Sequence, residues 1–172
     1  MALDWFVTWS THGSWLPGDP RGFQTWRGKE YVPPPRRYAK PGKPIYDPRQ
    51  YHDRWLLAKE MCPGAVTLTP EEQQLVLNAL VEDINLLPVQ PHILSVGDWH
   101  IHFIAQFGAL RIRPTVGRLK LHATLAIPKR TARKQIWAQG CHMKSLPDEE
   151  ALTNGIDYVR RHVEEGALIY EW

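Results

Sequence analysis

The chain has 172 residues, of which 43% are hydrophobic and 23% charged, and these values fit one soluble globular domain with a core of its own. Its net charge of +3 is too small to indicate a partner by itself. The sequence contains no run of membrane-spanning length and no basic-then-apolar leader, and its two distant cysteines exclude a disulfide framework. We therefore expect a cytoplasmic protein in which Cys62 and Cys141 are free thiols.

The first third of the chain combines one clear strand with a long irregular segment. Alternating side chains over residues 3–10 predict a strand, and the next twelve residues are rich in turn formers. Eight prolines follow between Pro17 and Pro48, with little periodicity. This stretch is too long for a plain connection, and its many aromatics argue against simple disorder. We expect residues 17–60 to be an inserted, functional segment.

The rest of the chain predicts alternating helices and strands. Thr69 and Glu72 form a capping box around Pro70, which predicts a helix from there to the region of Pro88. A hairpin is expected from a strand over 92–96, a Gly-Asp turn and a second strand over 99–107. A second helix is expected from Pro114, followed by a strand within 135–144. A last helix should run from about 147 to 165.

This order matches the βαββαβ plan of ferredoxin-like α+β domains. Such a domain has an antiparallel sheet with helices on one face. We expect residues 1–172 to form a single domain of this kind, with the last helix as an addition. In the second hairpin strand Trp99, Ile101 and Phe103 should face the helices, so His100 and His102 should look out from the uncovered face.

The two strand histidines are a candidate metal site. An H-x-H pair by itself is weak evidence, because two exposed strand histidines are more often ordinary surface, and a metal needs at least a third protein ligand. The last helix offers one in His162, four residues after Tyr158 and so on the same side, roughly 6 Å along the axis. Taken singly, Tyr158 reads as a boundary aromatic and His162 as a helix-end histidine.

The charge distribution favours nucleic acid as a partner. Residues 99–147 contain no Asp or Glu but nine Lys and Arg, and a second basic group within residues 21–43 lies among four aromatics. Cations hold phosphates and aromatic rings stack on bases, although a solvated basic face would give the same pattern.

These features together resemble the HUH-type single-tyrosine transposases, in particular the REP-associated tyrosine transposases. The resemblance rests on the first strand with the segment THGSWLPGDPRG after it, on DWHIH in the hairpin, on Leu119-Lys120 and Ile136-Trp137, and on Tyr158-x-x-x-His162. It spans most of the chain outside the proline-rich insertion. The family commonly has Asn or Gln where this chain has His162, and often has a proline just before its H-x-H segment, which is absent here.

The resemblance implies a transposase that cuts and rejoins single-stranded or hairpin DNA. His100, His102 and His162 would bind Mg²⁺ or Mn²⁺, and Tyr158 would form a 5′-phosphotyrosine intermediate. A basic and aromatic set would hold the DNA: Arg21, Trp26, Arg27, Arg36, Arg37, Arg111, Arg113, Lys120, Lys129, Arg130, Arg133 and Lys134.

Four questions stay open at the level of sequence. A nucleic-acid-binding protein that has lost strand transfer, a hydrolase in which a histidine-bound metal activates water, and a structural protein whose surface histidines bind nothing are alternative functions. Tyr170 is a second candidate nucleophile, ranked below Tyr158 because it lies outside the periodic helix. Relatives include dimers and monomers, so a homodimer is neither predicted nor excluded. No motif in the sequence indicates which DNA hairpin would be recognised.

Overall fold

A computed structural model describes residues 3–20, 22–24, 31–32, 47–62, 64–128 and 135–172. The backbone divides into two compact units, one made of Met1–Thr11 with Val66–Trp172 and the other of His12–Ala65. The first unit carries a five-stranded sheet and three helices among its described residues, and the second carries a short strand pair and one helix. The protein is therefore α+β.

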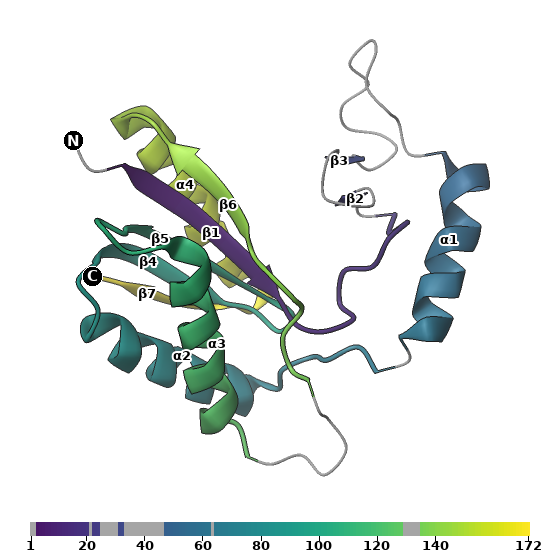
Figure 1. Cartoon of the computed structure of the whole chain (residues 1–172), viewed down its shortest axis with the longest axis horizontal. Coiled ribbons are helices and arrows are strands. Elements are labelled where there is room, and N and C mark those ends of the chain that lie inside the picture. Colours follow the sequence, from purple (N-terminus) through teal and green to yellow (C-terminus); the bar gives the residue numbers. More distant parts are fainter. Residues whose placement is uncertain (1–2, 21, 25–30, 33–46, 63, 129–134) are drawn as a thin grey trace. The chain divides into compact units, whose positions relative to one another are not determined.

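All five strands of the main sheet run antiparallel to their neighbours. The strands are β1 (Asp4–Ser10), β4 (Gln90–Val96), β5 (His100–Gln106), β6 (His142–Leu146) and β7 (Leu168–Glu171), in the order β6-β1-β5-β4-β7 (Figure 1). The histidine strand β5 lies at the centre, between β1 and β4. Together with α2 (Pro70–Asn85) and α3 (Ile112–Ala126), the first four strands follow the predicted order β-α-β-β-α-β along the chain.

Helices α2 and α3 cover one face of the sheet and enclose the main core. Ile101 and Phe103 of β5 are fully buried there against Leu80 of α2 and Leu119 of α3, as their alternation predicts. The start of α2 is the predicted capping box. The Glu72 amide donates to the Thr69 hydroxyl at 3.3 Å, and the Thr69 amide donates to the Glu72 carboxylate at 2.9 Å.

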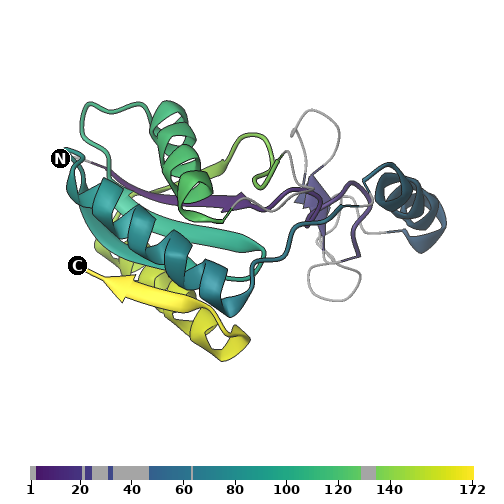
Figure 2. The same cartoon turned by 90° about the horizontal axis from the view of Figure 1, so that it is seen from below.

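Helix α4 (Glu149–Arg160) covers the opposite face of the sheet (Figure 2). Its buried Val159 packs with Ile93, Ile104 and Leu146 in a second, smaller core. At Gly155 the helix approaches the sheet so closely that a Cβ would lie 3.2 Å from the Cδ1 of Ile104. The helix continues into a short 3-10 turn, Arg161–Glu165, which precedes β7.

The prediction that the histidine face of the sheet is uncovered was therefore wrong. Only 6% of His100 and 5% of His102 is exposed, so both are buried. The reason lies in the strand itself, because Ile104 shares the face of the two histidines and gives α4 an apolar surface to pack on.

Two strands also differ from the sequence prediction. The strand expected within 135–144 begins only at His142, and Trp137 makes a single bridge to Thr11 instead. Strand β7, which pairs with β4 at the sheet edge, was not predicted. Its four residues are too few to show a periodicity above chance.

The second unit has a small core of its own. Strands β2 (Phe23–Gln24) and β3 (Tyr31–Val32) pair, and helix α1 (Pro48–Met61) begins after the N-cap Asp47. The buried rings of Phe23 and Tyr51 meet edge to face at 4.9 Å between their centroids. The inserted segment expected at 17–60 lies inside this unit. Helix α1 was not predicted from the sequence of that proline-rich segment.

Candidate metal centre

The strand histidines lie on the α4 face of the sheet. In the register of the central strands His102 stands between Thr8 of β1 and Ser95 of β4, and His100 stands opposite Ser10. Residues paired across antiparallel strands share a face, so the two imidazoles project on the same side. Their ring centroids are 4.6 Å apart.

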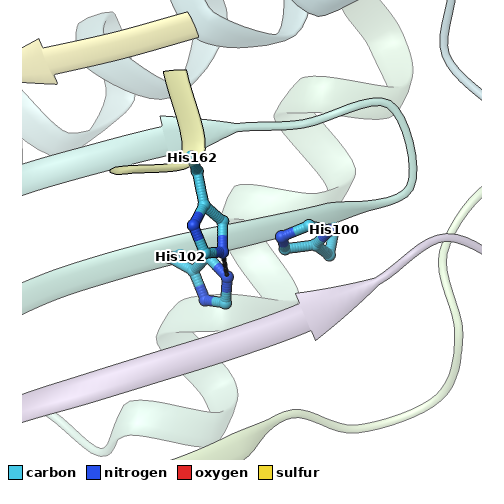
Figure 3. Close-up of side chains that lie close together, drawn as sticks. All are labelled: His100, His102 and His162. Atoms are coloured by element: carbon cyan, nitrogen blue, oxygen red, sulfur yellow. Dashed lines mark hydrogen bonds between the residues drawn. The ribbon is translucent and has the colours of Figure 1, made fainter. Parts of the chain in front are cut away.

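The 3-10 turn after α4 brings His162 to this pair. Its Nε2 lies 2.8 Å from Nε2 of His102, and its ring centroid lies 5.1 Å from that of His100. Figure 3 shows His162 extending from the turn to His102, with His100 beside this pair. One ligand nitrogen from each of the three falls within 4.8 Å of the others, and all three residues are buried. Together the three buried histidines can form a metal site.

A further contact fixes the orientation of one ring. Nδ1 of His102 hydrogen-bonds to the Thr8 hydroxyl at 2.8 Å. Partners of this kind hold metal-binding imidazoles in position and select the tautomer. Sequence reasoning missed Thr8, because its place beside His102 depends on the register between β1 and β5, which no local pattern gives.

Burial keeps the imidazoles of His102 and His162 neutral. Burial lowers the pKa of His102 well below its ordinary value, and the neighbouring His100 and His162 lower it further. Burial also lowers the pKa of His162, against an opposing effect of Glu165. Since a metal binds the neutral imidazole, these two histidines are in their ligating form near neutral pH.

Tyr158 lies at the edge of the cluster. Its ring centroid is 4.8 Å from that of His162, 5.6 Å from that of His102 and 5.8 Å from that of Phe6. The side chain is 46% exposed, so one part of the ring packs on the cluster while another part reaches solvent. A buried histidine cluster that could hold a metal, with a half-exposed tyrosine beside it, has the parts that a metal-assisted nucleophile needs.

Tyr170 lies elsewhere. It pairs with Leu94 across β4 and β7, and Leu94 belongs to the core under α2 and α3. Tyr170 therefore stands on the sheet face opposite the histidine cluster, where its ring contacts Trp172.

Most of the predicted DNA-binding set falls outside the described residues. These members are Arg21, Trp26, Arg27, Arg36, Arg37, Lys129, Arg130, Arg133 and Lys134. Of the other three, Arg111 is the N-cap of α3, while Arg113 and Lys120 line an open groove of about 690 Å³ between α3 and residues 135–141. Lys120 donates to the carbonyls of Ala138 and Gly140, so it ties this segment to α3. Helix α3 covers the face opposite the histidines, and the structure does not bring these cations to the cluster.

The described helices include none that is both long enough and apolar enough to cross a membrane. No known family model and no curated protein matches the sequence. A solved structure of a REP-associated tyrosine transposase bound to a REP hairpin superposes on the chain with a TM-score of 0.50 and 14% sequence identity. The match covers 96% of this chain and 69% of that one. At this identity the likeness shows that the chain has the fold of that transposase.

Proposed function

We propose that the chain is a metal-dependent single-stranded DNA endonuclease and strand transferase of the HUH single-tyrosine type. In this proposal residues 1–172 form one ferredoxin-like transposase domain that carries residues 17–60 as an insertion. Its substrate is hairpin DNA. The observation that carries the proposal is the position of Tyr158, whose half-exposed ring packs against a buried cluster of three histidines drawn from two distant parts of the chain. The fold shared with a hairpin-binding transposase supports it.

The chemistry follows from this arrangement. A divalent ion held by His100, His102 and His162 would supply Lewis-acid charge that polarises the scissile phosphate and favours the phenolate form of the tyrosine. Oη of Tyr158 forms the new bond to phosphorus, and the bond from phosphorus to the 3′ oxygen breaks. The phenolic proton passes to solvent, which the exposed part of the ring permits, and the leaving oxygen takes up a proton as a 3′-hydroxyl.

The products are a 5′-phosphotyrosine and a free 3′-hydroxyl end. The phosphotyrosine ester keeps the reactivity of the phosphodiester, so a 3′-hydroxyl can attack it and join strands without an energy cofactor. A single tyrosine handles one strand at a time, which suits single-stranded DNA. Basic residues of the set named above would hold the DNA through its phosphates.

A covalent-adduct assay tests the proposal. Labelled single-stranded hairpins are incubated with the protein and Mn²⁺, and the products are separated on a denaturing gel. We expect an adduct with the wild type, none with Tyr158→Phe, and a normal amount with Tyr170→Phe, because Tyr170 lies on the other face of the sheet. An adduct that survives Tyr158→Phe contradicts the assignment.

The same assay separates the alternatives. Tight hairpin binding with no adduct on any of a panel of hairpins indicates a binding protein that has lost strand transfer. Cleavage that survives Tyr158→Phe but is lost in His100→Ala indicates a hydrolase in which the metal activates water.

A further inference from the structure

The histidine cluster offers a metal only nitrogen ligands. His100, His102 and His162 each contribute an imidazole, and among the described residues no Asp, Glu or Cys belongs to the group. Mg²⁺ is a hard ion that binds oxygen ligands, usually one or two carboxylates, whereas imidazole suits Co²⁺, Ni²⁺ and Zn²⁺. The donor set is therefore unfavourable for Mg²⁺ before any geometry is considered.

The burial of the cluster acts in the same direction. The exposed fractions of the three side chains are only 6%, 5% and 7%. Mg²⁺ gives up its water molecules reluctantly and usually keeps several of them when a protein binds it. Three imidazoles that converge in a buried position favour an ion that exchanges water for nitrogen at little cost.

The ring of His102 is also anchored for ligation through Nε2. The Thr8 hydroxyl can accept a hydrogen bond from Nδ1–H of His102, and this tautomer turns the Nε2 lone pair toward His162. Nε2 of His162 lies 2.8 Å away in a hydrogen bond, so one of the two nitrogens carries a proton that a bound ion would displace. Two nitrogens at this separation are close enough to bind one ion together, so the ligands need little movement to form the site.

We propose that this site selects a transition-metal ion of the Co²⁺, Ni²⁺ and Zn²⁺ class over Mg²⁺, and that His162 is the residue that sets this preference. The proposal rests on the proposed function only in taking the histidine cluster as a metal site. His162 is the ligand that comes from outside β5, on the 3-10 turn after α4, so it can be changed without altering the strand. An amide oxygen there would give a mixed nitrogen and oxygen site, and the imidazole makes it all nitrogen.

The test is a metal titration without DNA. The purified full chain is stripped with a chelator and titrated with Co²⁺, whose visible absorption shifts and strengthens when imidazole nitrogens replace water ligands. We expect saturation at one equivalent, displacement of Co²⁺ by Zn²⁺, and a Co²⁺ affinity at least about 100-fold above that for Mg²⁺ in competition. Displacement of Co²⁺ by Mg²⁺ at similar concentrations, or no Co²⁺ spectrum at all, overturns the proposal, and both are read on the wild type alone.

A pair of variants locates the preference. His162→Gln replaces one ligand nitrogen by an amide oxygen, so the Co²⁺ affinity should fall at least about tenfold and the ratio to Mg²⁺ should narrow. His122→Gln changes a half-exposed histidine on α3, on the other face of the sheet, and should leave the titration unchanged. An unchanged titration in a folded His162→Gln, verified by circular dichroism, counts against the role of His162.

The outcome is separable from that of the proposed function. A normal Co²⁺ titration with no covalent adduct on any hairpin leaves the metal preference standing and removes the transposase. An adduct formed with Mg²⁺ as efficiently as with Co²⁺, together with equal affinities for the two ions, supports the transposase and removes the metal preference.

Discussion

The two faces of the main sheet are built from the same strands and differ in what they bury. The face under α2 and α3 buries only apolar side chains of the central strand, such as Ile101 and Phe103. The face under α4 buries an apolar patch around Ile104 at one part and the imidazoles of His100 and His102 at another. Burying imidazoles costs solvation, and they are retained where their hydrogen bonds or a ligand compensate. The contrast indicates that the first face serves folding and that the second combines folding with a site.

Substitutions on the two opposite faces should separate these two roles. Phe103→Ala removes a fully buried ring from the α2 and α3 face, so the free energy of unfolding should fall by about 3–5 kcal/mol in urea titrations. His100→Gln, on the other face, should cost clearly less stability while weakening Co²⁺ binding. Equal losses of stability would mean that the histidine cluster is as much a structural core as the other face.

The orientation of His102 gives the next largest effect. Thr8→Val keeps the shape of the side chain but removes the hydroxyl that hydrogen-bonds to Nδ1 of His102, so the affinity for Co²⁺ should fall by about 10–100-fold. Thr8→Ser keeps the hydroxyl and should stay within a few-fold of the wild type. A Thr8→Val protein with wild-type affinity would show that the imidazole needs no partner to bind metal.

The buried imidazoles should also make the metal-free protein sensitive to acid. The ordinary pKa of a histidine is 6.5, and the pKa of His102 is lowered in the folded chain. The unfolded chain therefore binds more protons than the folded chain below pH 6.5. The free energy of unfolding should therefore be level above pH 6.5 and fall below it, by up to about 1.4 kcal/mol per pH unit for this group.

Urea titrations between pH 5 and 8, with chelator present, measure this loss. The difference between the wild type and His102→Gln isolates the contribution of His102 from that of other groups. A difference that is independent of pH would show that His102 titrates alike in both states.

The sequence predicted local features well and the arrangement of faces less well. The capping box at Thr69, the alternation of β5 and the contact of Tyr158 with His162 are short-range patterns, and each is found in the structure. The last helix ends earlier than predicted, at Arg160, so His162 lies in the 3-10 turn that follows it. Two other features depend on how distant segments pack: α4 covers the sheet face that carries the histidines, and Thr8 contacts His102. No periodicity along the chain encodes those contacts, and the spacing that made the three histidines a candidate site did not indicate their burial.

The smallest expected effect belongs to the helix on the folding face. Thr69→Ala removes the hydroxyl that accepts from the Glu72 amide, and should lower the free energy of unfolding by about 1 kcal/mol. Thr69→Ser retains the cap and is the matched control. Since α2 lies on the face away from the histidines, the Co²⁺ titration of Thr69→Ala should be unchanged. A change in Co²⁺ affinity in Thr69→Ala would mean that the two faces are coupled through the sheet. The assignment of folding to one face and of the metal site to the other would then be wrong.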